Sequence, residues 1–210
     1  MKLEDIFTYK NLYKSFINVS RGKRHEESFI KYRSNLIINL KNIEYSFKHG
    51  NYVKLEYYSF IVSDPKYRVI WATSIDGRII QDCLCKNYLK DYFEPLLYEY
   101  NCACRLNKGV HYAMNRLKEM MINMYKNNNN HYYVVKFDIH KFFDNINHEI
   151  LKNKLINVLD IEIRDYLFYI IDSFEDGLPL GNQTSQWLAL YYLNDLDHAI
   201  KLRVSRKYVF

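Results

Sequence analysis

Two segments decide the fold of this chain: His131-Tyr-Tyr-Val-Val-Lys-Phe-Asp-Ile-His-Lys-Phe-Phe143 and Gly177-Leu-Pro-Leu-Gly-Asn-Gln-Thr-Ser-Gln186. The first contains an apolar run, residues 132–137, whose aromatic and β-branched residues predict a buried strand. That run ends at Asp138. A carboxylate at the end of a buried strand is costly unless a partner such as a metal ion compensates its charge. Capping of the following turn is the alternative that this segment leaves open.

The second segment predicts a constrained loop that leads into a long helix. Gly177, Pro179 and Gly181 restrict the loop, and Ser185 opens the helix. The apolar residues of the helix recur near helical spacing at Leu188, Tyr191, Tyr192, Leu196 and Ile200. A glycine loop before a helix exposes backbone N–H groups and can lie close against a flat ligand.

Together the two segments resemble two motifs of reverse transcriptases. Asp138-Ile-His-Lys-Phe-Phe143 resembles motif A, and the segment from Gly177 to Gln186 resembles motif B. Within motif B, Leu180-Gly-Asn-Gln-Thr-Ser-Gln186 is similar to the version in diversity-generating retroelements. Group II intron enzymes usually carry Gln before that glycine and Pro after that serine. The resemblance implies an α+β, right-hand polymerase fold with helix-rich fingers, an incomplete palm and no thumb.

The same resemblance implies three regions and one reaction. Residues 1–50 would form an N-terminal helical region, residues 51–130 the fingers, and residues 131–210 a partial palm with motifs A and B. The reaction would be RNA-directed DNA synthesis, in which a DNA or RNA primer attacks a deoxynucleoside triphosphate (dNTP) on an RNA template. Two Mg²⁺ ions would stabilise the attacking and leaving oxygens. Asp138 would be the catalytic residue that bridges the two ions, and the Ile139 carbonyl would hold one of them.

Further residues would bind the nucleotide and the template. Phe143 stands at the steric-gate position, where its ring would collide with a ribose 2′-hydroxyl, and plain core packing is the alternative for it. Gly181, Asn182 and Ser185 would support the templating base pair. Leu180 and Gln186 stand where this resemblance places the tuning of fidelity.

The composition indicates a folded protein with a polyanionic partner. Of the 210 residues, 49% are hydrophobic and 17% are aromatic, which is enough to bury a core. The net charge of +6 favours a polyanionic ligand without deciding it. No run approaches the ~18 apolar residues of a membrane span, and the first residues lack the apolar core of a signal peptide. We therefore expect a cytoplasmic protein without a membrane partner.

The four cysteines form two Cys-x-Cys pairs, Cys83 with Cys85 and Cys102 with Cys104. Structural zinc sites usually have two to four residues between such cysteines, so this spacing fits zinc poorly. Cys83 also falls on the apolar face of a predicted helix. We expect reduced, structural thiols.

The first 50 residues predict two helices around a basic loop. Leu12, Phe16 and Val19 mark the first helix. The apolar positions of a longer second helix are Phe29, Leu36, Leu40, Ile43 and Phe47. Between the two helices lies Arg21-Gly-Lys-Arg-His25, which is either a solvated connection or a phosphate contact along template or primer.

Residues 51–72 predict a β-hairpin with its turn at Asp64-Pro65-Lys66. Alternation along the second strand places Lys66 and Arg68 on one face. These two cations either face solvent or grip a triphosphate. The segment resembles the fingers strand of the polymerases named above, which makes Lys66 and Arg68 candidate nucleotide-binding residues.

Residues 76–98 predict a helix that resembles the Asp-Arg motif following this hairpin in the family, with Arg78 as a structural anchor. The next loop, from Tyr100 to His111, resembles a basic, glycine-containing loop of the family. Its Arg105 and Lys108 are candidate nucleic-acid contacts. The helix after that loop carries an apolar stripe from Val110 to Met121, which we expect to lie in the core.

Two more helices are predicted after Phe143. Asn145 or Asn147 can cap the first, whose inward residues would be Ile150, Leu151, Leu155, Val158 and Leu159. The second spans roughly residues 162–172.

One part of the family pattern has no match in this sequence. The second acidic cluster, Tyr-x-Asp-Asp, would follow the motif B helix, and the sequence ends at Phe210 near that point. We therefore expect that this polypeptide alone does not polymerise DNA, and an accessory protein subunit is a compatible partner. The alternatives are a group II intron-like or abortive-infection reverse transcriptase, and a short non-catalytic nucleic-acid-binding protein.

Overall fold

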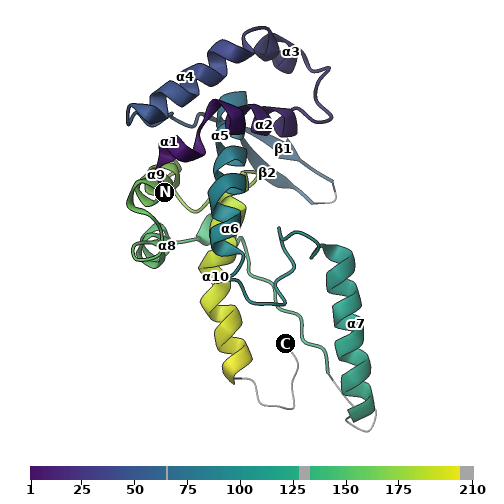
Figure 1. Cartoon of the computed structure of the whole chain (residues 1–210). Helices are drawn as coiled ribbons and strands as arrows, with labels where there is room; N and C mark the ends of the chain where they lie inside the picture. The colour runs from purple at the N-terminus through teal and green to yellow at the C-terminus, as the bar shows by residue number, and fades with distance from the viewer. Residues whose placement is uncertain (65, 128–132, 204–210) are drawn as a thin grey trace.

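The computed structural model describes residues 1–64, 66–127 and 133–203, and these residues form mainly helices (Figure 1). The N-terminal helices are α1 (Leu3–Ile6), α2 (Tyr9–Val19), α3 (Glu27–Ser34) and α4 (Leu36–Lys48). A hairpin follows, with strands β1 (Tyr57–Val62) and β2 (Arg68–Thr73). The next helical stretch consists of α5 (Ile75–Leu84), the π-helical turn η1 (Cys85–Leu89) and α6 (Lys90–Phe93). The remaining elements are α7 (Val110–Asn127), the 3₁₀ turn η2 (Phe143–Asn145), α8 (His148–Leu155), α9 (Ile161–Asp172) and α10 (Gln183–Arg203).

Helix α5 is the element around which the others are arranged. It contacts α2, β2 and α10, and α10 continues below it in Figure 1. Ser74 caps its N-terminus by accepting a hydrogen bond from the Gly77 N–H at 3.2 Å. This arrangement brings the N-terminal helices, the hairpin and the start of α10 to one place. None of the helices in the described ranges is long and apolar enough to cross a membrane.

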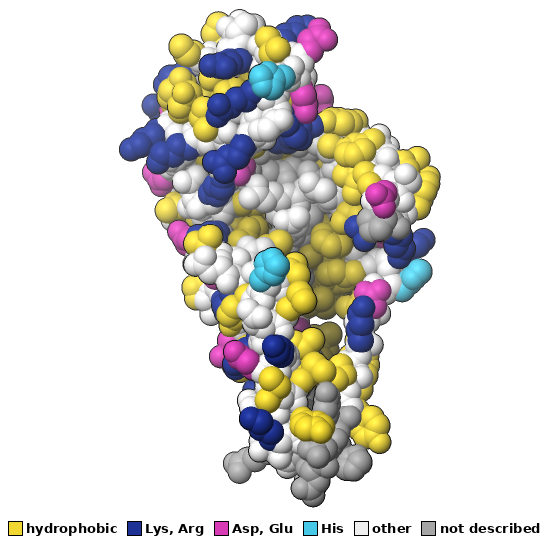
Figure 2. Space-filling view, turned by 90° about the vertical axis from the view of Figure 1, so that its right-hand side faces the viewer, with side chains coloured by type: hydrophobic (Ala, Val, Ile, Leu, Met, Phe, Trp, Pro, Cys, Tyr) yellow, Lys and Arg dark blue, Asp and Glu magenta, His cyan; other side chains and the backbone are white. Residues whose placement is uncertain are grey.

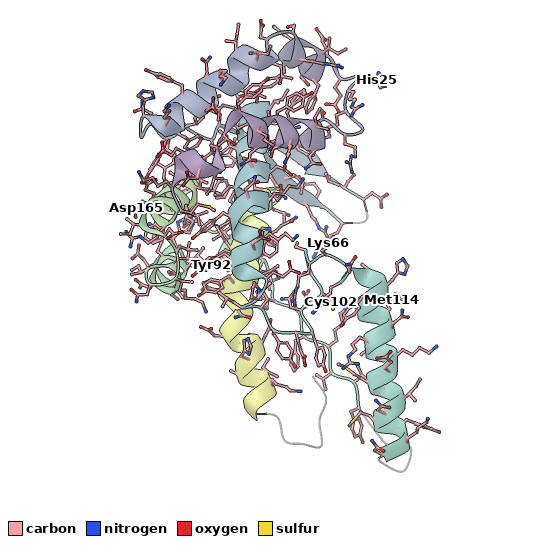
Figure 3. The ribbon with its side chains drawn as sticks, viewed as in Figure 1. His25, Lys66, Tyr92, Cys102, Met114 and Asp165 are labelled. Atoms are coloured by element: carbon pink, nitrogen blue, oxygen red, sulfur yellow. The ribbon has the colours of Figure 1, made fainter. Side chains whose placement is uncertain are left out.

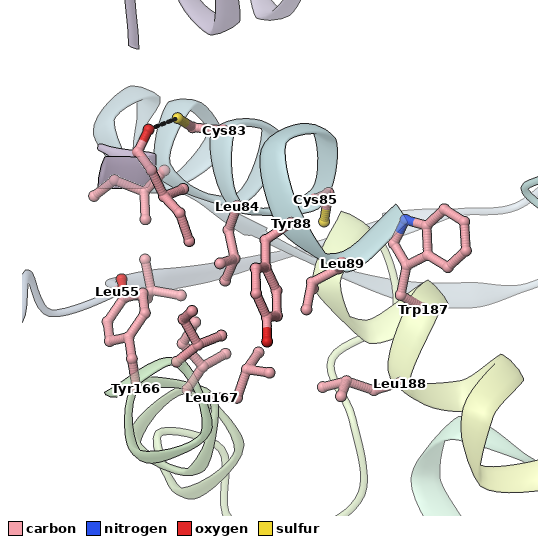
Figure 4. Packing of buried hydrophobic residues seen from close by; sticks show 14 of the residues in the cluster. Leu55, Cys83, Leu84, Cys85, Tyr88, Leu89, Tyr166, Leu167, Trp187 and Leu188 are labelled. Atoms are coloured by element: carbon pink, nitrogen blue, oxygen red, sulfur yellow. Dashed lines mark hydrogen bonds between the residues drawn. The ribbon is translucent and has the colours of Figure 1, made fainter. Parts of the chain in front are cut away.

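One hydrophobic cluster joins the N-terminal helices to the rest of the chain (Figure 4). Phe7 is fully buried and stacks on Phe47 of α4 with ring centroids 3.9 Å apart. The ring of Tyr166, from α9, lies edge-on to Phe7 at 6.0 Å. Cys83 lies within the same cluster, as its place on the apolar helix face predicted. Residues before the hairpin therefore share a core with α5, α9 and α10.

Several predicted elements are confirmed. The β1–β2 hairpin is antiparallel, with Tyr58 opposite Ala72 and Phe60 opposite Ile70, whereas Pro65 of the predicted turn lies outside the described residues. Asn147 caps α8 by accepting a hydrogen bond from the Ile150 N–H at 3.0 Å. Helix α9 agrees with the prediction to within a residue at its start. The side chain of Ile150 was expected to point inward, but it is 52% exposed.

The prediction of one long helix over residues 29–47 is wrong, because two helices form there. They meet at Asn35, whose backbone leaves the helical region at φ −115° and ψ 22°. The hydroxyl of Ser34 donates to the Lys31 carbonyl at 2.7 Å. Ser and Asn side chains compete with the helical backbone for hydrogen bonds in this way, so an apolar period alone did not reveal the break.

The prediction that the apolar stripe of α7 lies in the core is also wrong. No residue of α7 is buried, and Met114 and Leu117 are 61% and 50% exposed. Figure 1 shows α7 standing apart from α10 along most of its length. An apolar stripe identifies the face that favours contact, but it does not identify an element that covers it.

The predicted buried strand at residues 132–137 does not form in its described part. Residues 133–137 have no regular secondary structure, and Tyr133 and Phe137 are 97% and 82% exposed. Tyr132 lies outside the described residues. The sheet of the described residues contains only β1 and β2, so no strand there pairs with this segment. An apolar run becomes a buried strand only when neighbouring strands satisfy its backbone groups.

Tyr166 offers a test of the core. It is fully buried, its hydroxyl has no hydrogen-bond partner among the described residues, and burial holds its pKa well above the usual value. We expect Tyr166→Phe to raise the free energy of unfolding by about 1 kcal/mol, because a buried hydroxyl without a partner is destabilising. Urea denaturation measures this difference.

Tyr57→Phe is the matched control for that measurement. The Tyr57 hydroxyl accepts a hydrogen bond from Ser173 Oγ at 3.2 Å. Its removal should lower the free energy of unfolding by about 1 kcal/mol. A loss of stability in Tyr166→Phe equal to that in the control would contradict the expectation.

Candidate functional site

A cavity of about 290 Å³ lies where β2, α5, the loop of residues 177–182 and the basic loop of residues 21–25 meet. Its lining residues are Val19, Lys23, Phe60, Ile70, Ala72, Thr73, Arg78, Gln81, Gly181, Asn182 and Gln183. Gly181 and Asn182 were predicted as site residues, and the structure brings both to this cavity. Lys23 comes from the basic loop, for which a phosphate contact was one of the two predicted roles.

The loop of residues 177–182 is fixed to β2 through a single residue, Trp71. The Trp71 N–H donates to the Leu180 carbonyl at 2.8 Å. The Trp71 carbonyl accepts from Asn182 Nδ2 at 3.1 Å. In the hairpin Trp71 lies opposite Ser59 of β1. The loop therefore lies along the edge of β2 that faces away from β1.

Gly181 allows this close approach. Its φ is +114°, and a Cβ there would lie 2.7 Å from Ile70 Cγ2 and 3.2 Å from the Trp71 carbonyl oxygen. Any other residue would be strained by the backbone conformation and would also displace the side chain of Ile70. The glycine predicted for contact with a flat ligand thus also makes contact with β2.

Gln81 connects α5 to the same loop. Its Nε2 donates to Asn182 Oδ1 at 2.8 Å. Its Oε1 accepts from the Gln183 N–H at 3.1 Å and from the Thr184 hydroxyl at 3.3 Å. Gln81 is only 2% exposed, so water does not compete for these bonds. The start of α10 is consequently held by a side chain of α5.

The cavity carries positive charge. Its lining residues include Lys23 and Arg78 and no Asp or Glu. The guanidinium of Arg78 donates through Nε to the Thr73 carbonyl at 3.0 Å and also bonds the Tyr58 hydroxyl. These contacts agree with the structural anchor predicted for Arg78. Lys23 is exposed, and no ion pair involves it among the described residues.

The other end of the loop is bound to the segment after Asp138. The Leu178 N–H donates to the Phe143 carbonyl at 2.8 Å, and His148 Nε2 donates to the Gly177 carbonyl. Phe143 itself is half-buried, with its ring edge-on to Phe142 at 5.6 Å. The two segments that decide the fold thus meet at Phe143.

Two predicted nucleotide-binding residues, Lys66 and Arg68, do not line the cavity. Both side chains are exposed. Figure 3 shows Lys66 near the tip of the hairpin, and Arg68 pairs with Val62 at the start of β2. The cations that do line the cavity come instead from the basic loop and from α5.

Asp138 and Ile139, the predicted metal-binding residues, lie in exposed chain without regular structure. No group of three or more His, Cys, Asp or Glu residues that could hold a metal ion exists within the described ranges. A single exposed carboxylate is a poor divalent-cation site, because Mg²⁺ needs several oxygen ligands in fixed geometry. The described residues therefore do not fit the two Mg²⁺ ions that the motif A resemblance implied.

The predicted nucleic-acid contacts Arg105 and Lys108 are engaged by backbone carbonyls of their own loop and of the residues just before it. Arg105 Nη1 donates to the carbonyls of Tyr98 and Asn101 at 2.9 and 3.3 Å. Lys108 Nζ donates to the Glu99 carbonyl at 2.6 Å. These bonds order the loop and leave fewer donors for a phosphate.

Arg105 also lines a second groove, of about 600 Å³, on the other side of Gln183. Exposed Gln186 lies there and accepts a bond from Cys104 Sγ at 3.3 Å. The lining also includes Lys86, Lys90 and Trp187. Ser185, one residue earlier on α10, is 2% exposed and does not line this groove. The predicted motif B residues are thus divided: Gly181 and Asn182 line the cavity, Gln186 lines the groove, and Ser185 is buried.

Gln81 is a residue of this site that the sequence interpretation missed. A signal for it exists, because Gln81 stands among Ile79, Ile80, Cys83 and Leu84, all of which are buried on α5. A polar residue within an apolar stripe must find hydrogen-bond partners when the stripe is buried. That rule shows that Gln81 needs partners, but it does not show that the partners are Asn182 and the start of α10, 101 to 103 positions along the chain.

Figure 2 shows how the surface around these elements is arranged. Lys and Arg side chains gather on the upper part of that face, over the N-terminal helices, and hydrophobic side chains cover much of the lower part. The surface between the two is hollowed. A basic rim above a hollow suits an extended anionic ligand.

Residues 62–210 match the family described as reverse transcriptase (RNA-dependent DNA polymerase). This range includes β2, α5 and the whole loop of residues 177–182, but not the basic loop that contributes Lys23. No curated protein matches the chain.

Proposed function

The chain belongs to the reverse transcriptase (RNA-dependent DNA polymerase) family, and from this premise we propose that the cavity beside Gly181 receives the incoming dNTP together with its templating base. The family acts as nucleotidyltransferases, with a nucleic-acid template and primer and with nucleotides as substrates. The observation that carries the proposal is the junction of β2, α5 and the 177–182 loop around a cavity with cationic and no acidic lining residues.

The lining suits a nucleotide in three respects. Phe60 and Ile70 offer apolar contact for a base, and Gly181 lets its flat face approach the backbone. Lys23 supplies positive charge for a phosphate.

The remaining site residues keep the roles proposed from motifs A and B. Asp138 is our candidate for the transfer reaction, and half-buried Phe143 is our candidate for excluding a ribose 2′-hydroxyl. Mg²⁺ does not follow from the described residues, which contribute binding and orientation of the nucleotide.

The Leu180 and Gln186 pattern supports a reverse transcriptase of a diversity-generating retroelement. A template repeat and a variable repeat beside the gene would test that subclass.

Removal of the Lys23 charge tests the proposed ligand. The probe is a DNA primer annealed to an RNA template with a 5′ RNA overhang, and fluorescence anisotropy gives its Kd at several salt concentrations. We expect Lys23→Met to weaken binding about three- to tenfold at 0.1 M salt. The slope of log affinity against log salt should become shallower by about 0.7–0.9, as for the loss of one phosphate contact.

Lys54→Met is the charge-matched control. Lys54 is also exposed, but it does not line the cavity. Its loss should change the affinity by less than about twofold, through net charge alone. Equal losses of affinity in the two variants, or binding that does not depend on salt, would refute the phosphate contact assigned to Lys23.

A further inference from the structure

We propose that Gln81 is a positioning residue that sets nucleotide selection by fixing the part of the cavity wall that Gly181 and Asn182 form. The inference rests on the proposed function, and it adds a residue for which the sequence interpretation assigned no role. Gln81 acts through Asn182 and the start of α10, because its amide atoms are already bonded to them.

Only a side-chain amide satisfies this position. Gln81 must donate to Asn182 Oδ1 and, at the same time, accept from the Gln183 N–H and the Thr184 hydroxyl. A carboxylate has no donor at neutral pH, and a thioether has neither a strong donor nor a strong acceptor. The bond to Asn182 also fixes which way the Asn182 amide faces, so that its Nδ2 meets the Trp71 carbonyl.

The network reaches the cavity through residues that line it. Hydrogen bonds run without a break from Gln81 on α5 through Asn182 to Trp71 on β2. Gly181 lies between Leu180 and Asn182, the two loop residues that bond to Trp71. Buried, fully bonded networks of this kind hold one geometry, whereas partly bonded ones do not. Because Asn182 and Gly181 form part of the cavity wall, loss of the Gln81 amide should widen the range of shapes that the cavity accepts.

The test compares how well the protein selects a nucleotide. The probe is a dideoxy-terminated DNA primer on an RNA template, which binds a dNTP without reacting, in a Mg²⁺-containing buffer. The readout is the ratio of Kd values for a mismatched and a matched dNTP. The variants are Gln81→Met, which keeps the side-chain length and removes all three bonds, and Gln81→Glu, which keeps the acceptor and removes the donor.

Asn194→Leu is the control for a merely structural role. Asn194 is also a buried amide, bonded to the Tyr98 N–H at 3.0 Å and to the Leu96 carbonyl at 2.9 Å, but it does not line the cavity. Its loss should lower thermal stability about as much as Gln81→Met does, because both leave buried groups unpaired.

We expect the selectivity ratio to fall about tenfold in both Gln81 variants and to stay at the wild-type value in Asn194→Leu. A wild-type ratio in Gln81→Met, or an equal fall in Asn194→Leu, would overturn the positioning role. A wild-type protein that does not distinguish the two dNTPs would refute the proposed function itself, and the role of Gln81 with it. The failures of the two proposals are thus distinguishable.

Discussion

Gly177→Ala is expected to lower the free energy of unfolding by about 3–5 kcal/mol. Gly177 has φ +65°, and a Cβ there would lie 2.3 Å from the Phe143 carbonyl oxygen and 2.7 Å from the Asp144 carbonyl carbon. Both atoms belong to the backbone, so no side-chain rotation relieves the contact. The loop would have to leave Phe143, with loss of the Leu178 N–H bond. Urea denaturation followed by circular dichroism measures the change.

Gly22→Ala separates the steric effect from the backbone effect. Gly22 has a similar φ of +76°, but a Cβ there would have no neighbour within 4 Å. We expect this control to cost about 1 kcal/mol, the strain of a left-handed alanine alone. Equal losses in the free energy of unfolding in the two variants would show that the clash between a Cβ at residue 177 and the Phe143 backbone has no energetic importance.

The sequence predicted the parts of this site whose signal is local. The hairpin, the Asn147 cap and the glycines of the 177–182 loop follow from turn chemistry and from alternation over a few residues. Motif resemblance then brought Gly181, Asn182 and Gln186 to attention, and the structure places the first two together in the cavity. Local rules therefore located the elements and part of the cavity wall.

The sequence could not predict which elements pair across long distances. Residues 133–137 and the stripe of α7 are apolar and were expected to be buried, yet Val135 and Met114 are 69% and 61% exposed. Burial requires a covering element, and the periodicity of a segment contains no information about its cover. Lys23 and Gln81 were missed as partners in one cavity for the same reason, since nothing local connects residue 23, residue 81 and residue 182.

The second large effect concerns the N-terminal helices, which precede the residues that match the reverse transcriptase family. We expect Phe7→Ala to lower the free energy of unfolding by about 3–5 kcal/mol, as for other fully buried Phe residues. Phe7 has no exposed surface, and its ring packs between Phe47 of α4 and Tyr166 of α9. Helix α9 lies inside residues 62–210, so the matched region depends on the N-terminal helices for its core.

Ile37→Ala is the control for Phe7→Ala, because Ile37 lies in the same N-terminal region and is 66% exposed. It should change stability by less than about 0.5 kcal/mol. A small effect of Phe7→Ala would mean that the N-terminal helices and the matched region unfold independently. A large effect has a consequence for the site as well, because α2 and the basic loop contribute Val19 and Lys23 to the cavity. The packing of Phe7 would then be one of the contacts that hold Lys23 beside Gly181, and Phe7→Ala would weaken binding of the primer–template probe through a residue that does not touch it.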